Sequence, residues 1–116
     1  MADILIIEDD KIVREYLCEG LNAAGFQVFD AKNGDHAVCL LQQHSRNVVQ
    51  TDLVMDEGEG IESIMKIRKI NPTVHIIAMS GNLKYLKAIG TLGTDSMLLK
   101  PFRMPQLIDV LEQGCR

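Results

Sequence analysis

Several apolar segments of this chain end in a polar side chain that could take part in chemistry. The segments ILII, NVVQT, VHIIAM and MLL lead into carboxylates, a hydroxyl and an ammonium group. These polar residues are Glu8, Asp9, Asp10, Asp52, Ser80 and Lys100. Because ligands bind beyond the carboxyl ends of the strands in an open α/β sheet, residues that close such strands converge at one edge. The pattern predicts a pocket for phosphoryl chemistry on a carboxylate.

The acids of this pocket are expected to bind a divalent cation. Carboxylates within a few ångströms repel one another, and a cation between them removes the conflict. Mg²⁺ (or Mn²⁺) prefers hard oxygen ligands and keeps several of its waters. We expect Asp9 and Asp52 as direct ligands, Glu8 as a ligand through water, and the Val54 backbone carbonyl to complete the set.

Two further residues suit the transferred phosphoryl group. Lys100 would supply positive charge next to its oxygens, and Ser80 would donate a hydrogen bond to one of them. Each residue also has a simpler interpretation, because acids often cap helices and a lysine often pairs with a carboxylate. Four such placements at strand ends favour the functional interpretation, since an unpaired buried carboxylate such as Asp52 would be costly.

The elements that position these residues follow from apolar spacing. Short apolar segments bounded by turn or charged residues predict strands over residues 4–7, 26–29, 48–52, 74–79 and 97–99. Apolar residues at helical spacing follow each strand, over residues 12–24, 35–41, 61–70, 83–89 and 104–111. Asp9 or Asp10 is the expected cap of the first helix, and Gly25 its expected end.

This alternation predicts an α/β fold with a five-stranded parallel sheet between two helical layers. The usual strand order of such a sheet is 2-1-3-4-5, with the ligand site at the point where the order reverses. Strands one and three then lie side by side, which brings Glu8, Asp9 and Asp52 together. At 116 residues, the chain is expected to form one domain over residues 1–116.

Charge and composition exclude several classes of function. A net charge of -4 and a pI near 5.3 disfavour direct nucleic-acid binding, which needs a clustered basic surface. No segment predicts membrane insertion or a secretory signal. The three cysteines have no metal or redox spacing, so we expect Cys18 and Cys39 to be buried or half-buried and Cys115 to be a free thiol. A reducing, cytoplasmic location is expected.

The motifs ILIIEDD, TDLVM with Gly60 eight residues past the aspartate, IIAMSG and LLKPF occur in this order over nearly the whole chain. Together they resemble the receiver domain of two-component response regulators, of the stand-alone, chemotaxis-regulator-like kind. The resemblance implies a flavodoxin-like fold and a phosphoryl group transferred to Asp52 from a histidine kinase or phosphotransfer protein. It also implies Mg²⁺ bound by Glu8, Asp9 and Asp52, phosphoryl oxygens bound by Ser80 and Lys100, and a cis Lys100–Pro101 bond.

The resemblance further implies a signalling domain that catalyses only its own phosphorylation and dephosphorylation. A downstream target protein would read the surface formed by the fourth helix, the fifth strand and the fifth helix. Val54 and Asn82 are the positions expected to tune the rate of dephosphorylation. Three residues depart from the family pattern: Met97 replaces the usual aromatic switch residue, Asp56 the usual proline, and Glu59 the usual aspartate. The segment between Ser80 and Lys100 is also short for the family.

Three other functions are weighed against this one. A Mg²⁺-dependent phosphohydrolase would need a general acid two residues beyond the nucleophile, where Val54 stands. A nucleotide-binding module would need a glycine-rich turn where this chain has Glu8, Asp9 and Asp10. A degenerate receiver that binds partners without phosphorylation is disfavoured by the intact site, although Met97 favours it.

Overall fold

Five strands and four helices are described along the chain, and a described helix follows each strand except β4. The structure is a computed structural model that describes residues 3–43, 48–52, 59–82, 84, 86, 87 and 94–114, with backbone alone at Asp52 and Glu59. The strands are β1 (Asp3–Ile7), β2 (Gln27–Ala31), β3 (Val48–Asp52), β4 (His75–Ser80) and β5 (Ser96–Leu99). The helices are α1 (Lys11–Ala23), α2 (Gly34–Gln43), α3 (Glu59–Ile70) and α5 (Met104–Gly114). The predicted fourth helix lies mostly outside the described residues.

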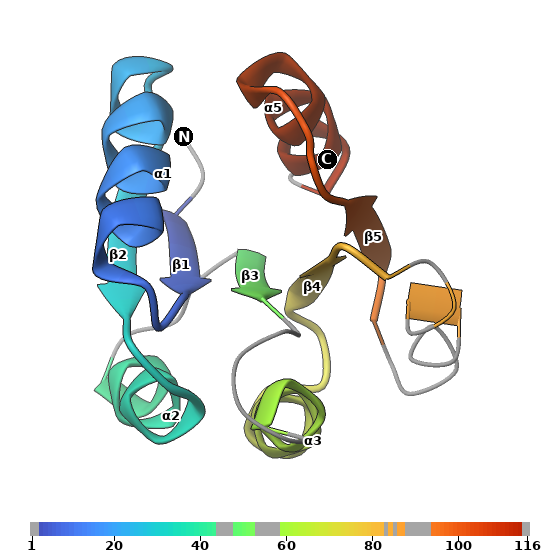
Figure 1. Ribbon diagram of the computed structural model, residues 1–116. Helices are drawn as coiled ribbons and strands as arrows, with labels where there is room; N and C mark the ends of the chain where they lie inside the picture. Colours follow the sequence, from blue (N-terminus) through green and yellow to red (C-terminus); the bar gives the residue numbers. More distant parts are fainter. Residues whose placement is uncertain are drawn as a thin grey trace.

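The strands form one parallel sheet in the order β2-β1-β3-β4-β5, which confirms the predicted topology. Helices α1 and α5 cover one face of the sheet, and α2 and α3 cover the other (Figure 1). Successive residues of a strand point to opposite faces. Accordingly, Ile4 and Ile6 of β1 pack with α1 and α5, whereas Leu5 and Ile7 pack with the residues of α2 and α3. This two-sided burial explains why the strands read as continuous apolar segments.

Strand β2 lies one to two residues later than the sequence predicts. Phe26 was expected to begin it, but its N–H donates to the carbonyl of Leu21 at 3.1 Å and so belongs to the turn that ends α1. Gly25 in this turn has a φ of 100°, in the left-handed region that favours glycine. Pairing along all of β1, from Asp3 to Ile7, then extends β2 to Ala31.

The cysteines only partly match expectation. Cys18 is half-buried, and burial, followed by the nearby Asp30 carboxylate, raises the pKa of its thiol. Cys39 is exposed, which corrects the prediction of burial. It lies two residues from both Ala37 and Leu41, the buried positions of α2, and therefore on the opposite side of this helix. Cys115 lies outside the described residues. No helix in the described part of the chain is long and apolar enough to cross a membrane.

Arg68, in the last turn of α3, joins the segments that lead into β4 and β5. Its Nη1 donates to the carbonyls of Pro72 at 2.8 Å and Val74 at 2.7 Å, and its Nη2 donates to Asp95 Oδ2 at 2.8 Å. Asp95 Oδ2 also accepts a hydrogen bond from the N–H of Ile76 at 2.9 Å. This group of contacts, the Arg68–Asp95 cluster, lies at the amino ends of β4 and β5.

The Asp95 carboxylate is stabilised by these contacts. Burial acts to raise its pKa, but the Ile76 N–H and the Arg68 guanidinium, with the nearby His75, outweigh burial and hold the pKa below its usual 3.8. The unfolded chain therefore binds more protons near this pH than the folded chain does. The stabilisation is present above about pH 4 and is lost as the pH falls through the folded-state pKa.

We predict that Asp95→Asn makes the free energy of unfolding less dependent on pH between about pH 5 and pH 3 than in the wild type. The difference should stay below about 1 kcal/mol, because the Arg68–Asp95 ion pair is partly exposed. Urea unfolding at several pH values measures it. Asp109→Asn, which changes an exposed acid of α5, is the control. Identical pH profiles for Asp95→Asn and the wild type would contradict the role of the cluster.

Two glycines let helices approach closely, with different tolerance for a side chain. A Cβ at Gly34, the first residue of α2, would overlap Ser63 Oγ of α3 and lie 3.3 Å from Ser63 Cα. A Cβ at Gly20 of α1 would meet only the end of the Met104 side chain. The flexible Met104 side chain can move aside for an added methyl group, whereas the Ser63 backbone cannot. The packing of α2 against α3 therefore requires glycine at position 34 more strictly than the packing of α1 requires it at position 20.

Gly34→Ala should lower the free energy of unfolding by about 1–3 kcal/mol, because the helices must separate. Gly20→Ala should be nearly neutral, since the gain in helix propensity, roughly 1 kcal/mol, offsets the displacement of Met104. Thermal or urea unfolding of both variants tests the contrast. Equal losses in the two would show that Ser63 yields as easily as Met104.

Candidate functional site

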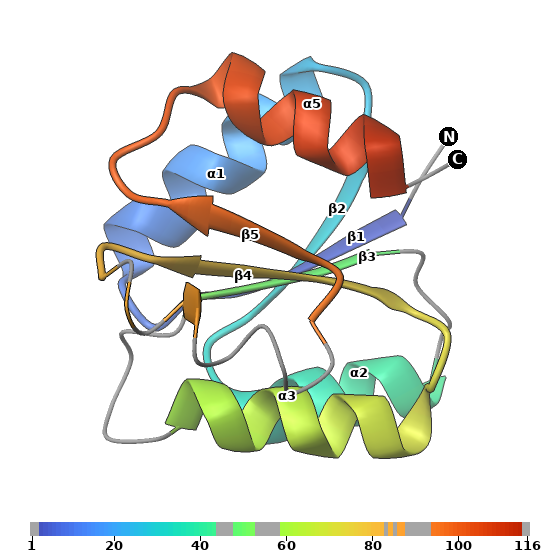
Figure 2. The same ribbon diagram turned by 90° about the vertical axis from the view of Figure 1, so that its right-hand side faces the viewer.

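The strand ends expected to carry the site lie side by side. Ile7 of β1 pairs with Thr51 of β3, so the residues that follow β1 lie next to the end of β3 at Asp52. Asp52 in turn pairs with Met79 of β4. The carboxyl ends of β4 and β5 point to the edge of the sheet where α1 begins (Figure 2). The sheet thus brings the backbone of Glu8, Asp52, Ser80 and Lys100 to one edge.

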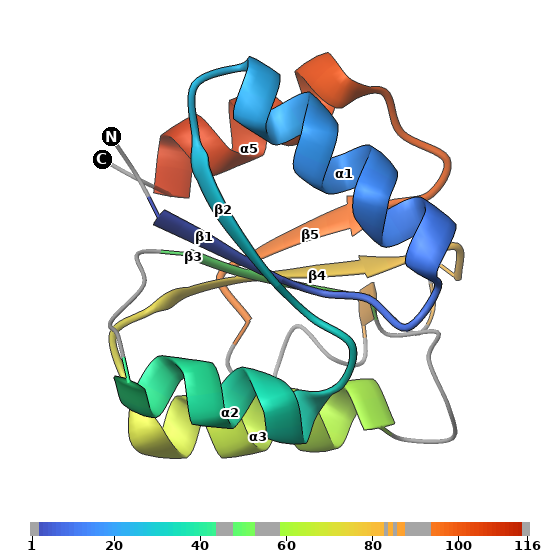
Figure 3. The ribbon, with the colours of Figure 1, turned by 90° about the vertical axis from the view of Figure 1, so that its left-hand side faces the viewer.

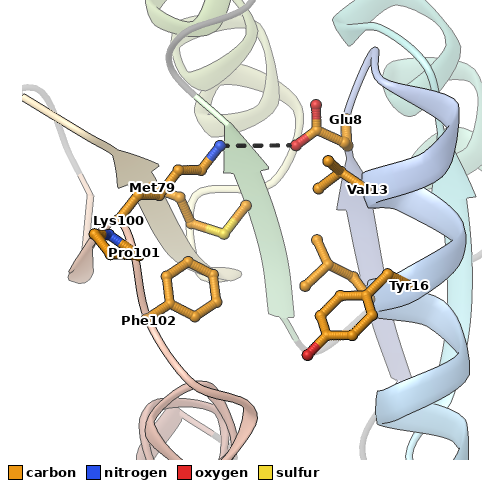
Figure 4. Close-up of a pocket in the computed structure, with 8 residues that line it drawn as sticks. Glu8, Val13, Tyr16, Met79, Lys100, Pro101 and Phe102 are labelled. Atoms are coloured by element: carbon orange, nitrogen blue, oxygen red, sulfur yellow. Dashed lines mark ion pairs between the residues drawn. The ribbon is translucent and has the colours of Figure 1, made fainter.

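Glu8 and Lys100 face each other across this edge. The Glu8 side chain is 2% exposed, and Lys100 Nζ lies 4.0 Å from its Oε1 (Figure 4). Glu8 Oε2 accepts a hydrogen bond from the N–H of Asp10 at 3.2 Å. A carboxylate withdrawn from water needs such partners to offset its lost hydration. Asp9, between these two acids, is exposed to solvent.

Ser80 is joined to the segment that carries Lys100. Its side chain is fully buried, and its Oγ accepts a hydrogen bond from the N–H of Asn82 at 3.1 Å. The N–H of Lys100 donates to the carbonyl of Ser80 at 2.8 Å. The Lys100–Pro101 bond is cis, as expected. The residues that carry the hydroxyl and the ammonium group are therefore joined by a backbone hydrogen bond between β4 and the end of β5.

Part of the predicted site lies outside the structural description. This applies to the side chain of Asp52 and to Val54 and Asp56 entirely. Among the residues whose side chains are described, no three acids, histidines or cysteines lie close enough to hold a metal ion. Met97, the predicted switch residue, is 45% exposed on β5.

A cleft of about 480 Å³ opens beside the Glu8–Lys100 pair. Apolar side chains from α1 form one wall, and the segment between β5 and α5 forms the other (Figure 4). Its lining comprises Glu8, Val13, Tyr16, Leu17, Met79, Lys100, Pro101 and Phe102. The sequence did not predict this cleft, because Tyr16 and Phe102 are separated by most of the chain.

Arg14 is a second feature that the sequence did not reveal. Its Nη1 donates to the backbone carbonyl of Glu8 at 2.7 Å, and its Nε donates to Asp30 Oδ2 at 3.1 Å. The only signal in the sequence was an arginine one turn beyond the helix cap Asp10. That position does not distinguish an arginine that bonds the preceding turn from one that faces solvent.

A model of the response regulator receiver domain matches residues 4–112. The chain therefore belongs to the response regulator receiver family, which confirms the resemblance inferred from its motifs.

Individual relatives agree with this assignment. The response regulator receiver protein CpdR of Brucella abortus is 32% identical over 97% of this chain and 96% of its own length. The chemotaxis protein CheY of Halobacterium salinarum is 30% identical over 93% of this chain and 92% of its own length. The structure of the chemotaxis protein CheY4 of Vibrio cholerae superimposes with a TM-score of 0.90 over 98% of both chains. At 23% identity, that structure supports the fold alone.

A buried amide lies two residues before Asp52. Gln50 is fully buried on β3, and its Nε2 contacts Met79 Sδ at 2.8 Å. Its Oε1 has no hydrogen-bond partner among the described residues. A buried acceptor without a partner keeps its full desolvation penalty. Gln50 therefore buries an acceptor for which the described residues supply no hydrogen bond.

Gln50→Leu should raise the free energy of unfolding by about 1 kcal/mol, because it removes the buried acceptor at nearly constant volume. Urea unfolding measures the change. Gln42→Leu, at an exposed position of α2, should stay within about 0.5 kcal/mol of the wild type. A loss of stability in Gln50→Leu would show that the amide makes favourable contacts worth more than its burial costs.

Proposed function

We propose that this chain is a single receiver domain that accepts a phosphoryl group on Asp52 from a histidine kinase or phosphotransfer protein. Its family membership and the placement of Glu8 against Lys100 support this function. The observation that carries most weight is the convergence of the buried Glu8, the buried Ser80 and Lys100 with the end of β3 at one edge of the sheet. The cytoplasmic location stays a prediction.

The donor set suits a hard divalent cation. Glu8 and Asp9 follow β1, Asp52 ends β3, and all offer oxygen. We propose that these three residues, with the carbonyl of Val54, hold Mg²⁺. When bound, Mg²⁺ would offset negative charge on the phosphoryl oxygens. Of the two acids in this set whose side chains are described, Glu8 is held more firmly than the exposed Asp9, since it is buried and accepts the N–H of Asp10.

The transfer itself requires little of the protein beyond placement and charge. An oxygen of the Asp52 carboxylate attacks phosphorus, and the new O–P bond forms as the N–P bond to the donor imidazole breaks. The imidazole leaves and takes up a proton. The Lys100 ammonium group attracts the phosphoryl oxygens, and the Ser80 hydroxyl donates a hydrogen bond to one of them. Attack of water on the acyl phosphate would later release inorganic phosphate and restore Asp52.

Signalling would begin with the links between Ser80 and Lys100. A phosphoryl group on Asp52 adds negative charge beside both residues. Because the Ser80 carbonyl accepts the Lys100 N–H, a shift of Ser80 toward the phosphoryl group would also affect the end of β5. Met97 and Leu99 on that strand are about half exposed and offer apolar side chains to a target protein. The surface of helix four, β5 and α5 is the proposed readout.

Incubation with acetyl phosphate and Mg²⁺, followed by intact mass measurement, tests the proposal. The wild type should gain one phosphoryl group. Asp52→Asn should gain none, because its amide is a poor nucleophile, and EDTA should prevent the gain in the wild type. Asp109→Asn on α5 is the matched control and should behave as the wild type.

Other results would indicate other functions. Phosphorylation that persists in Asp52→Asn would remove Asp52 from its role. Continuous release of phosphate from unrelated phosphomonoesters would indicate a hydrolase. No gain of mass under any condition would leave a receiver that binds its partners without phosphorylation.

A further inference from the structure

We propose that Arg14 is a positioning residue that holds the turn carrying Glu8 and Asp9, and that it thereby sets the affinity of the site for Mg²⁺. The inference rests on the proposed function. It adds a residue that contacts neither the cation nor the phosphoryl group and acts through the backbone of the acids.

The Arg14 side chain bonds back across the turn from which its own helix starts. Its Nη1 donates to the Glu8 carbonyl at 2.7 Å, and its Nε donates to Asp30 Oδ2 of β2 at 3.1 Å. The side chain is only 16% exposed. Figure 3 shows α1 beginning next to the ends of β1 and β2 that these bonds connect. The planar guanidinium is suited to this task because it presents two donors in a fixed geometry.

The hydrogen bond from Arg14 to the Glu8 carbonyl adds to two other bonds that hold Glu8 in place. The Glu8 N–H donates to the carbonyl of Ala31 at 3.1 Å, and Glu8 Oε2 accepts the Asp10 N–H at 3.2 Å. The Arg14 N–H also donates to the Asp10 carbonyl at 2.9 Å. Backbone on both sides of Asp9 is therefore bonded, although Asp9 itself is exposed.

Of the two Arg14 contacts, the bond to the Glu8 carbonyl is the stronger restraint, because it is short and partly buried. Asp30 is about half exposed, and ion pairs of that exposure contribute little to folding. Ligand geometry is different, because Mg²⁺ demands near-ideal octahedral coordination. Groups that orient metal ligands without touching the metal typically change its affinity by about 10–100-fold. The restraint on Glu8 should therefore affect cation binding in addition to stability.

Electrostatics and positioning predict opposite effects when Arg14 is changed. Removing a positive charge near acids should strengthen cation binding, whereas releasing the turn should weaken it. Arg14→Met removes the charge and both donors but keeps an unbranched apolar stem. Lys11→Met removes one positive charge from an exposed residue of the same helix, so it is the matched control for charge.

Isothermal titration with MgCl₂ measures the dissociation constant without any phosphodonor. We expect Arg14→Met to bind Mg²⁺ about tenfold more weakly than the wild type, Arg14→Lys to fall between them, and Lys11→Met to bind as tightly as the wild type or slightly tighter. Urea unfolding checks that each variant is folded. If Arg14→Met does not fold, Arg14→Lys decides.

The rate of phosphorylation by acetyl phosphate gives a second readout. In Arg14→Met it should fall at low Mg²⁺ and recover at saturating Mg²⁺, because only cation affinity is changed. Equal loss at all Mg²⁺ concentrations would overturn the inference, as would Mg²⁺ affinity equal to or above that of the wild type. Failure of the wild type to bind Mg²⁺ would instead refute the proposed function, so the two failures are distinguishable.

Discussion

Burial of the Glu8 carboxylate is the constraint on which the rest of the site depends. A charged group can leave water only where opposite charge and hydrogen bonds replace its hydration. Here the Lys100 ammonium group, 4.0 Å away, and the Asp10 N–H supply them. Glu8 follows β1 and Lys100 follows β5, with β3 and β4 between them in the sheet. The pair therefore forms only when these four strands are paired in register.

Much of this architecture could be predicted because its causes are local in sequence. Strands buried on both faces require unbroken apolar segments, and α/β alternation with right-handed crossovers leaves few arrangements of the sheet. Placement of Glu8, Ser80 and Lys100 at one edge follows from that order alone. The limits of β2 could not be predicted, because whether Phe26 belongs to the strand or to the preceding turn depends on its bond to Leu21.

Contacts between polar surface residues escaped prediction for a different reason. In the sequence, nothing distinguishes Arg14 and Arg68 from arginines that face solvent. In the structure, each donates hydrogen bonds to backbone carbonyl oxygen and to an aspartate distant in sequence. Their roles depend on which turn lies within reach, and tertiary structure alone decides that. For Gln50, burial could be predicted, because it lies inside an apolar strand. Its contact with Met79 could not, because that contact depends on which strand lies beside β3.

The position of the Arg68–Asp95 cluster has a consequence for how such a domain can change. It fastens the amino ends of β4 and β5, whereas Ser80 and Lys100 lie at their carboxyl ends. The contacts that anchor these strands and the proposed phosphoryl-binding residues at their carboxyl ends thus lie at opposite borders of the sheet. A substitution at one border therefore removes none of the contacts that hold the other border in place.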